Sequence, residues 1–281
     1  MKRRIHAMMA IAAASALALS ACGDGGNGGG DGEQGPGGGG DTIRIRTKYD
    51  QPGLGLKDGD TMTGFDVDVA KYVADKLGYG EDQIEWVEAP SAQRETLLQN
   101  KQVDIVVATY SITDERKEVV SFAGPYFISG QDLLVRADED RIDGPEDLNG
   151  LNLCSVSGST SAARIKEDIA EEVQLIEQPG YSECLQFLTG GEVDAVTTDD
   201  IILAGLAAEA GGGDMRVVGN TFSEERYGVG IPQDSDQCEE ITDAINEMID
   251  DGSWQEFIDT NTEGVDYSPS ADNPPTPDAC E

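Results

Sequence analysis

The chain has 281 residues, enough for one large domain or two modest ones, and 38% of them are hydrophobic, enough for a folded core. Its charge balance is extreme, because 19 lysines and arginines stand against 55 aspartates and glutamates, for a net charge of −36. This balance argues against nucleic acid and anionic lipid surfaces as partners. We interpret the acidity as a means of solubility, for instance in a salty habitat, in preference to an acidic-partner role.

The first 21 residues are typical of a signal peptide. Lys2, Arg3 and Arg4 precede an apolar run, Met8–Leu19, that is too short to span a bilayer as a helix. The run ends in the letters LSAC, and this pattern resembles the lipobox of bacterial lipoproteins. That resemblance implies cleavage before Cys22 and a lipid on its thiol. The alternative is an ordinary secretory signal followed by a chance cysteine.

Residues 22–41 follow as a glycine-rich stretch, which predicts a flexible tether. Within it, the flexible run Gly23–Gly40 has a reach of roughly 23 Å. A lipid anchor on such a tether would hold the folded part beside a membrane and leave it free to reorient. No other stretch is long and apolar enough to be transmembrane.

Histidine and cysteine usage limits the chemistry that the mature chain can perform. The only histidine, His6, lies inside the signal peptide, so no histidine remains for a metal site or a histidine-assisted nucleophile. We therefore expect neither metal nor cofactor. Beyond the lipobox four cysteines remain, an even number in an oxidising location, and they allow three pairings. We expect Cys154–Cys184 within one lobe and Cys238–Cys280 holding the C-terminal tail.

Residues 42–131 begin a pattern of alternating strands and helices. The expected elements are the strand Thr42–Thr47, the helix Gly64–Gly78, the strand Gln83–Glu88, the helix Gln93–Asn100 and the strand Val103–Ala108. Ser91 is a candidate N-cap for the second helix. In that frame Arg94 lies in the first turn, where a cation opposes the helix dipole and so indicates an anion nearby. The pattern predicts an α/β lobe with a largely parallel sheet.

The stretch Asp104–Tyr126 carries the strongest signal of a site. Its strand runs into four hydroxyl residues, Thr109, Tyr110, Ser111 and Thr113. Arg116 follows in what we expect to be the first turn of a short helix. Hydroxyls, free backbone N–H groups and a guanidinium together suit a small carboxylate. The alternative is a surface arginine that pairs with Glu115 or Glu118.

A second α/β pattern occupies residues 132–224, after an extended run over Ser129–Arg136. Its expected elements are the strands Leu151–Val156, Val173–Glu177 and Val193–Thr197, and the helices Ala162–Glu171, Ser182–Leu188 and Ile201–Ala210. A strand at Tyr227–Ile231 returns to the first lobe, where the helices Glu239–Asp250 and Trp254–Asn261 follow. We therefore expect one lobe from residues 42–131 and 225–263, a second from 132–224, and an irregular tail, 264–281. Two extended crossovers between two lobes form a hinge with a cleft.

Four motifs in this order resemble a known family, namely GFDVDVAKYVADKLG, ITDERKEVVSFAGPY, VDAVTTDD and DGSWQEF. They are similar to the polar-amino-acid family (family 3) of periplasmic solute-binding proteins, the extracytoplasmic receptors of ABC importers. The resemblance covers Thr42 to about Asn261. Within the family, TKYDQPG, SAQRETLLQN and ATYSITDERK most resemble the glutamate-binding lipoproteins of actinobacteria. The resemblance implies a periplasmic-binding-protein-like α/β fold with two lobes and a ligand cleft between them.

The resemblance also implies roles for individual residues. Arg116 of the TDER motif would grip the α-carboxylate of an amino acid, and Asp199 at the end of VDAVTTD would bind its α-ammonium. Without the family, Asp199 is equally well explained as the N-cap of the following helix, a task that Asp200 could also take. The turn Ser157–Thr160 either meets the α-carboxylate or simply caps the next helix. The expected ligand-binding residues are Lys48, Ser91, Arg94, Thr109, Tyr110, Ser111, Arg116, Ser157, Ser159, Thr160, Thr198 and Asp199.

The choice of ligand depends on Lys48 and Arg94. In relatives that bind acidic amino acids, cations in the matching places flank the side-chain carboxylate. A neutral amide ligand would leave two buried cations unpaired, at a cost of several kcal/mol. We therefore expect L-glutamate, with aspartate next and glutamine weaker. The alternatives are a solvated Lys48 and an Arg94 paired with Glu95 or Glu88.

The expected function is capture of the amino acid by lobe closure, outside the cell membrane, and delivery to a permease driven by a cytoplasmic ATPase. The protein would act as a monomer and not as an enzyme. One alternative is a dehydratase-like enzyme that uses Glu88, Glu95 or Asp199 as a general acid, although no nucleophile–base pair supports it. Another is an amino-acid sensor domain that signals to a membrane kinase. Turnover of prephenate-like substrates would favour the enzyme, and ligand-dependent uptake would favour transport.

Overall fold

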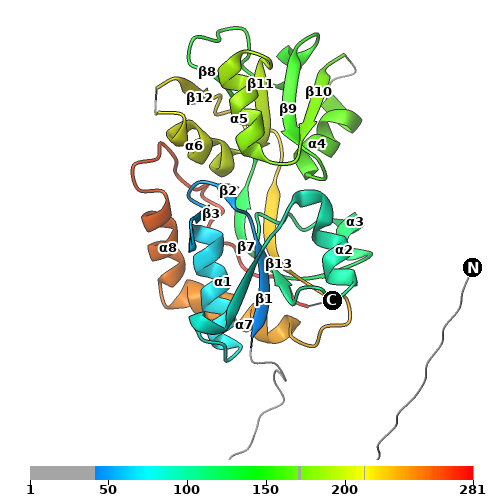
Figure 1. Cartoon of the computed structure of the whole chain (residues 1–281), viewed down its shortest axis with the longest axis vertical. Coiled ribbons are helices and arrows are strands. Elements are labelled where there is room, and N and C mark those ends of the chain that lie inside the picture. Colours follow the sequence, from blue (N-terminus) through cyan, green and yellow to red (C-terminus); the bar gives the residue numbers. More distant parts are fainter. Residues whose placement is uncertain (1–41, 170–171, 212, 281) are drawn as a thin grey trace, which may run out of the picture. The chain divides into compact units, whose positions relative to one another are not determined.

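The computed structural model describes residues 42–280, except residues 170, 171 and 212 (Figure 1). The expected signal peptide, Cys22 and the glycine-rich tether lie outside the described residues. Within the described ranges, no helix is long and apolar enough to cross a membrane.

The first lobe is built on a five-stranded sheet with the strand order β5-β1-β6-β13-β7. Its strands are β1 (Ile43–Thr47), β5 (Ile84–Glu88), β6 (Ile105–Val106), β7 (Ser121–Ser129) and β13 (Glu225–Ile231). Strand β1 pairs in parallel with β5 and β6, and β13 runs antiparallel to β6 and β7. The helices of this lobe are α1 (Phe65–Lys76), α2 (Arg94–Gln99), α3 (Asp114–Lys117), α7 (Cys238–Asp250) and α8 (Ser253–Asn261). Short 3₁₀ segments precede β5 (η1, Glu81–Gln83) and α2 (η2, Ser91–Gln93).

The second lobe has a sheet of the order β10-β9-β11-β8-β12. Its strands are β8 (Gln131–Arg136), β9 (Asn152–Val156), β10 (Gln174–Gln178), β11 (Ala195–Asp199) and β12 (Met215–Val217). Strands β10, β9 and β11 are parallel, whereas β8 is antiparallel to both β11 and β12. The helices are α4 (Thr160–Arg164), continued by a π-helical segment (η4, Ile165–Ile169), then α5 (Tyr181–Gly190) and α6 (Asp200–Glu209), with a 3₁₀ turn (η3, Pro145–Leu148) after β8.

Two crossovers connect the lobes. The chain leaves the first sheet after β7 and enters the second at β8, and it returns between β12 and β13 (Figure 1). Gly130 lies where the crossovers meet, since a Cβ atom there would come within 2.8 Å of both the Ser223 carbonyl oxygen and the Thr221 side chain. The expected fold, two α/β lobes joined by a two-strand hinge, is confirmed. The strands change sheet at Gly130 and again between Val217 and Glu225.

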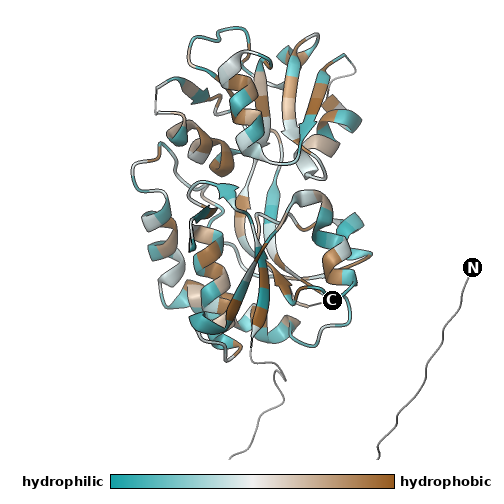
Figure 2. Ribbon diagram, viewed as in Figure 1, coloured by the Kyte–Doolittle hydropathy of each residue, from teal (hydrophilic) through white to brown (hydrophobic). Residues whose placement is uncertain are grey.

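An aromatic cluster holds the first lobe together. Phe65 of α1 lies within 6.0 Å, centroid to centroid, of Tyr126, Phe127 and Trp254. The indole N–H of Trp254 donates a hydrogen bond of 2.7 Å to the Tyr126 carbonyl. Buried aromatic pairs of this kind stabilise a core beyond the area that they bury. The late motif DGSWQEF therefore fixes α8 against β7. Figure 2 shows the apolar residues along the strands and on the helix faces turned toward them.

Two disulfides have the pairing that the sequence predicts. Cys154 of β9 is bonded to Cys184 of α5, with Cα atoms 5.5 Å apart, and Cys238 is bonded to Cys280, with Cα atoms 6.0 Å apart. The tail is also held by Asn273, whose side-chain amide receives a hydrogen bond from the Ile128 N–H and donates one to its carbonyl. These bonds attach the tail to β7, next to the hinge.

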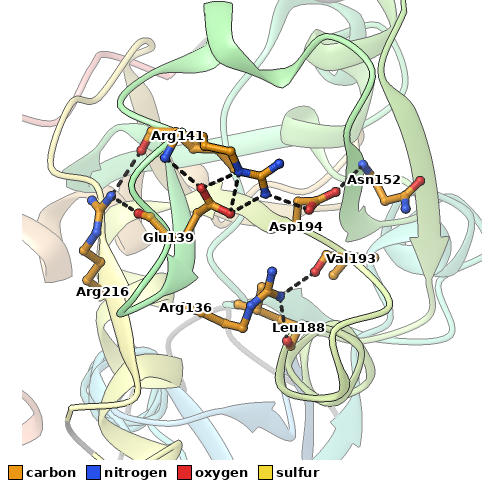
Figure 3. Close-up of polar contacts among 9 residues, drawn as sticks. Arg136, Glu139, Arg141, Asn152, Leu188, Val193, Asp194 and Arg216 are labelled. Carbon is orange, nitrogen blue, oxygen red and sulfur yellow. Dashed lines mark hydrogen bonds and ion pairs between the residues drawn. The ribbon is translucent and has the colours of Figure 1, made fainter.

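A cluster of arginines stabilises the second lobe (Figure 3). We call Arg136, Arg141 and Arg216, with their partners, the lobe-2 arginine cluster. Arg141 forms ion pairs with Glu139 and Asp194, at 2.5 and 3.3 Å, and Arg216 donates to the Glu139 carbonyl. Arg136 donates to the carbonyl of Leu188, in the last turn of α5, and to that of Val193, which follows the helix.

The structure differs from the predicted elements at three places. Residues 50–63 form a small sheet of β2 (Asp50–Gln51), β3 (Gly55–Asp58) and β4 (Thr61–Thr63), a region in which no strand is predicted. Strands this short carry too little alternation to be recognised among turn residues. Strand β7 begins at Ser121, well before the predicted extended run. The helix predicted over Ala162–Glu171 is α-helical only to Arg164.

Candidate ligand-binding site

A small cavity, lined mostly by buried polar residues, lies between the two lobes. The first lobe contributes Gln51, Ser91, Arg94, Thr109, Ser111 and Arg116, and the second contributes Ser159, Thr160, Ser161, Tyr181, Thr198, Asp199 and Ile202. Thr109 follows β6, and Asp199 ends β11. The cavity is thus at the carboxyl ends of parallel strands, where open α/β sheets bind their ligands.

The backbone of Thr109 is held in an unusual conformation. Its φ of +45° is in the left-handed region, which a threonine seldom adopts. The buried carboxylate of Asp66, in the first turn of α1, accepts hydrogen bonds of 2.7 Å from the Thr109 N–H and the Tyr126 hydroxyl. Burial raises the pKa of Asp66 to about 6, although both hydrogen bonds oppose this. The motif GFDVD therefore positions the loop that carries the hydroxyls of the site.

Arg116 lies in the short helix α3 and reaches across the opening of the cavity. Its Nη1 donates to the Ser111 carbonyl at 2.7 Å, and its Nε pairs with Glu95 at 3.2 Å. Its Nη2 donates to the Gly158 carbonyl of the other lobe at 3.3 Å. Thr113 caps α3 by accepting from the Arg116 N–H, which fixes the guanidinium at the cavity. The expected alternative, pairing with Glu115 or Glu118, is not what the structure shows.

Arg94 is buried to 2% exposure, with only neutral partners. Its Nη1 donates to the Ala108 carbonyl at 3.1 Å, and its guanidinium lies 4.3 Å from the centroid of the Tyr110 ring. The Arg116 guanidinium is 4.9 Å from the centroid of the same ring, so the Tyr110 ring forms cation–π contacts with both arginines. Burial, and next the charge of Arg116, lower the pKa of Arg94 to about 10. Within the described residues Arg94 forms no ion pair, which excludes the expected alternative of pairing with Glu95 or Glu88.

Lys48 is buried behind Ser91 and does not line the cavity itself. Its Nζ donates a hydrogen bond of 2.8 Å to the Ser91 hydroxyl oxygen, and both residues are 3% exposed. The prediction that Ser91 caps α2 is wrong, because Ser91 opens the 3₁₀ turn η2 and its hydroxyl accepts from Lys48 instead. The alternative of a solvated Lys48 is excluded by its burial. Burial, followed by the charge of Arg94, lowers the pKa of Lys48 to about 7.

Asp199 provides a buried carboxyl group on the opposite wall. Its Oδ2 accepts a hydrogen bond of 2.5 Å from the Tyr227 hydroxyl of β13. Its carboxylate does not cap α6; the carboxylate of Asp200, the first residue of that helix, accepts a hydrogen bond from the Ile201 N–H. Burial, followed by the carboxylate of Glu225, raises the pKa of Asp199 far above its usual range. A cation placed beside Asp199 would favour its ionised form.

The second lobe adds hydroxyl groups. Ser159 caps α4 by accepting from the Ala162 N–H at 3.0 Å, so the capping role expected of this turn is present. Thr198 donates to the Tyr181 hydroxyl at 2.6 Å. Ser157 lies in the same turn but does not line the cavity, and its N–H donates to the Gln178 carbonyl.

The lobes are closed over the cavity. Besides the bond from Arg116 to Gly158, the Asp50 carboxylate of the first lobe accepts from the Tyr181 N–H of the second at 2.8 Å. Gly158 has a φ of +77°, and a Cβ atom there would lie 2.6 Å from the Ala92 Cα. Only glycine allows both this backbone conformation and this approach of the lobes.

Three buried polar atoms at the cavity have no hydrogen-bond partner among the described residues. They are the Nε2 of Gln51, the Nε of Arg94 and the Oδ1 of Asp199. Buried polar groups are rarely left unpaired in folded proteins, because an unmade hydrogen bond is costly. Two donors on one wall and an acceptor on the other match a ligand with both an anionic and a cationic group. No group of acidic, cysteine or histidine side chains in the described part of the chain is arranged to hold a metal ion.

Nine of the predicted site residues line the cavity: Ser91, Arg94, Thr109, Ser111, Arg116, Ser159, Thr160, Thr198 and Asp199. Lys48, Tyr110 and Ser157 lie behind it. The prediction does not include Gln51, Ser161, Tyr181 and Ile202, which also line the cavity. Tyr181 begins α5 and Gln51 ends the short strand β2, and neither position carries a signal in the sequence without the fold.

The fold and the site define a class: two-lobed binding proteins that enclose a small polar ligand between α/β lobes. The chain belongs to the bacterial extracellular solute-binding proteins, family 3, whose family model matches residues 43–262. It is 50% identical over 235 residues to the glutamate-binding protein GluB of Corynebacterium glutamicum, which covers 78% of each chain. It is 38% identical over 202 residues to a glutamine-binding protein of Geobacillus stearothermophilus, covering 70% of this chain and 76% of the relative.

A solved structure is similar throughout the described lobes. The structure of an ancestral arginine-binding protein bound to glutamine is 34% identical, with a TM-score of 0.73, over 78% of this chain and 97% of the other. Such similarity is expected when closely related proteins share one fold. The match places this chain among amino-acid-binding proteins of the two-lobed type.

Proposed function

We propose that this protein captures L-glutamate outside the cell by closure of its two lobes and delivers it to the permease of an ABC importer. The observation that carries the proposal is the set of unpartnered buried atoms at the cavity: donors of Gln51 and Arg94 and an acceptor of Asp199. An amino acid with an acidic side chain supplies a partner for each. The 50% identity to the GluB protein supports glutamate as that amino acid.

Arg116 and the hydroxyls of Thr109 and Ser111 receive the α-carboxylate in this proposal. A charged bidentate pair is among the strongest contacts available to a carboxylate. Asp199 receives the α-ammonium. The positive charge of this group lowers the raised pKa of Asp199 and so favours the ionised carboxylate. Because these groups belong to different lobes, a ligand makes all contacts in the closed form alone, and binding shifts the population toward closure.

Arg94 receives the side-chain carboxylate. It is buried, and no carboxylate among the described residues pairs with it, so a glutamate ligand supplies the missing charge. Glutamine leaves that charge unpaired, and aspartate is shorter by one methylene. The expected order of affinity is glutamate, then aspartate, then glutamine.

Titration calorimetry with the three amino acids tests the proposal. Glutamate is expected to bind most tightly and to compact the protein in X-ray scattering. Tighter binding of glutamine, or no compaction on adding glutamate, would contradict it.

Cys22 anchors the protein in this proposal, after removal of a signal peptide spanning residues 1–21, and residues 22–41 act as its tether. The LSAC pattern supports this part. The protein then works as a monomer without catalysis and hands its ligand to a permease with a cytoplasmic ATPase. Palmitate labelling in cells tests the anchor: wild type is expected to be labelled and to sediment with membranes, whereas Cys22→Ala is not.

A further inference from the structure

The C-terminal tail is fixed to the first lobe at both of its ends. It begins after α8, which the aromatic cluster holds against β7. Near its far end, Asp278 forms an ion pair of 2.9 Å with Arg226 of β13, and Cys280 is bonded to Cys238 of α7. All of these partners belong to the first lobe, so both ends of the tail move with that lobe.

The middle of the tail lies against the second lobe. It runs beside α6 (Figure 1), and residues 264–268 line grooves that they share with this helix. Tyr267 makes the direct contact, because its ring packs against the apolar core and its hydroxyl donates to the Asp200 carboxylate at 3.4 Å. Asp200 is the first residue of α6 and follows Asp199 of the ligand cavity. The tail therefore connects the two lobes.

The carboxylate of Asp200 joins the tail to the hinge. Its Oδ1 accepts from the Tyr267 hydroxyl, from the Ser129 hydroxyl at the end of β7 and from the Ile201 N–H. Burial, and next the charge of Asp200, raise the pKa of Tyr267, so its hydroxyl keeps its proton and donates. The hydrogen bond from Tyr267 is the longest of the three, so packing of its ring supplies most of the contact.

The two lobes also meet beside this contact. Gly205 of α6 lies against the loop between β2 and β3, since a Cβ atom there would come within 2.3 Å of the Pro52 carbonyl oxygen. Pro52 and Gly205 line one groove together with Val265 and Tyr267 of the tail. A separation of α6 from this loop on opening would also remove α6 from the tail.

We propose that the tail is a strap across the lobe interface, which stabilises the closed arrangement through the contact of Tyr267 with α6. A contact made only in the closed form shifts the lobe equilibrium toward closure. Ligand then binds more tightly, because the binding-competent form is more populated. Tyr267 does not line the cavity, so it acts on the lobe equilibrium and not on the ligand. The inference goes beyond the proposed function and rests on it, because it concerns capture by closure.

Calorimetry with glutamate and aspartate in wild type and in Tyr267→Ala tests the proposal. We expect the substitution to weaken glutamate binding by roughly 3- to 30-fold, the effect of losing one weak hydrogen bond and the packing of one ring. Affinity for aspartate is expected to fall by the same factor, because closure is common to both ligands. X-ray scattering with saturating glutamate should still show compaction.

Tyr72→Ala is the matched control. The Tyr72 hydroxyl donates to the Asp251 carboxylate at 2.7 Å, and its ring centroid lies 6.3 Å from that of Phe257. Both partners belong to the first lobe, so this variant loses the same side chain, a carboxylate contact and ring packing without any contact between lobes. Its glutamate affinity is expected to equal that of wild type.

A second arm releases one end of the tail. Replacing Cys238 and Cys280 by serine removes the disulfide, whereas Asn273 and Asp278 still hold the tail to β7 and β13. We therefore expect a smaller loss of glutamate affinity, about twofold. In a Tyr267→Ala background the serine replacements are expected to have no further effect, because the contact that they would weaken is absent.

The outcomes separate the two proposals. Wild-type protein that does not bind glutamate, or binds it without compaction, would refute the proposed function and this inference with it. Wild-type protein that binds glutamate and compacts, while Tyr267→Ala keeps the same affinity, would refute the inference alone. Unequal losses for glutamate and aspartate would also refute it, as would an equal loss of affinity in Tyr72→Ala.

Discussion

Arg94 of the ligand cavity and Arg141 of the lobe-2 arginine cluster have opposite surroundings. In the cluster, Arg141 meets the carboxylates of Glu139 and Asp194, and Arg136 donates to two carbonyls that the fold supplies (Figure 3). At the cavity, Arg94 is more deeply buried, has an unpartnered Nε and stands beside a second cation, Arg116.

This difference shows how one residue type serves two purposes. A cation whose partners belong to the fold stabilises the fold, and its partners are present with or without ligand. A buried cation without an anionic partner destabilises the empty protein, and that cost is recovered when an anion arrives. The position of the missing partner therefore indicates where the ligand binds. Four substitutions test the comparison.

Arg116→Ala is expected to have the largest effect on binding. Removing one partner of a buried ion pair costs about 3–5 kcal/mol, which corresponds to a loss of glutamate affinity of about 150-fold or more. Titration calorimetry measures it. Arg116→Lys keeps the charge but lacks the planar fork, so it is expected to recover only part of the affinity. Affinity within a few fold of wild type in Arg116→Ala would show that the α-carboxylate binds elsewhere.

Asp199→Asn is expected to weaken every amino-acid ligand and to remove a pH dependence. The pKa of Asp199 is raised in the empty site, and the α-ammonium binds to the ionised form. Affinity should thus fall as the pH decreases through this raised pKa, starting near neutrality and not near 3.9, the ordinary value for aspartate. Calorimetric titrations from about pH 5 to about pH 8 compare the two proteins. A wild-type affinity as flat with pH as that of Asp199→Asn would contradict an ionised Asp199 in the complex.

Arg94→Met is expected to change binding and stability in opposite directions. Glutamate affinity falls by roughly 10- to 100-fold because the side-chain carboxylate loses its charged partner. The empty protein should unfold at the same or a higher temperature, since an unpaired buried charge has been replaced by an apolar side chain. Thermal unfolding with and without glutamate measures both effects. A clear loss of stability in the empty protein would mean that Arg94 has a structural role.

Arg136→Met, the same replacement in the lobe-2 arginine cluster, is expected to reverse this pattern with the smallest effect. The carbonyls of Leu188 and Val193 lose a charged donor, which lowers the free energy of unfolding by about 1–2 kcal/mol. Glutamate affinity should remain as in wild type, because no residue of the cluster lines the cavity. Denaturant unfolding and calorimetry check the two quantities. A change of affinity comparable to that of Arg94→Met would remove the distinction between the two groups of arginines.

The sequence by itself determines the order of the elements and the division into two α/β lobes. Those features follow from local patterns: apolar residues at helical spacing in α1 and α7, apolar strands such as that ending before Thr109, and glycines between them. The position of Arg116 is local as well, because a helix start fixes it within one turn of Thr113. For the same reason the strand end at Asp199 could be predicted.

Only the tertiary structure decides which side chains face the ligand cavity and which stand behind it. Lys48 donates a hydrogen bond to Ser91 and does not line the cavity, and the ring of Tyr110 contacts two arginines. Gln51 and Tyr181 line the cavity. Each of these relations joins residues far apart in the chain. They depend on which loops come into contact when the lobes close. The periodicity of apolar residues within one helix or strand does not predict contacts between different loops. The missing partners of Arg94 and Asp199 are likewise visible only once every neighbour has been placed.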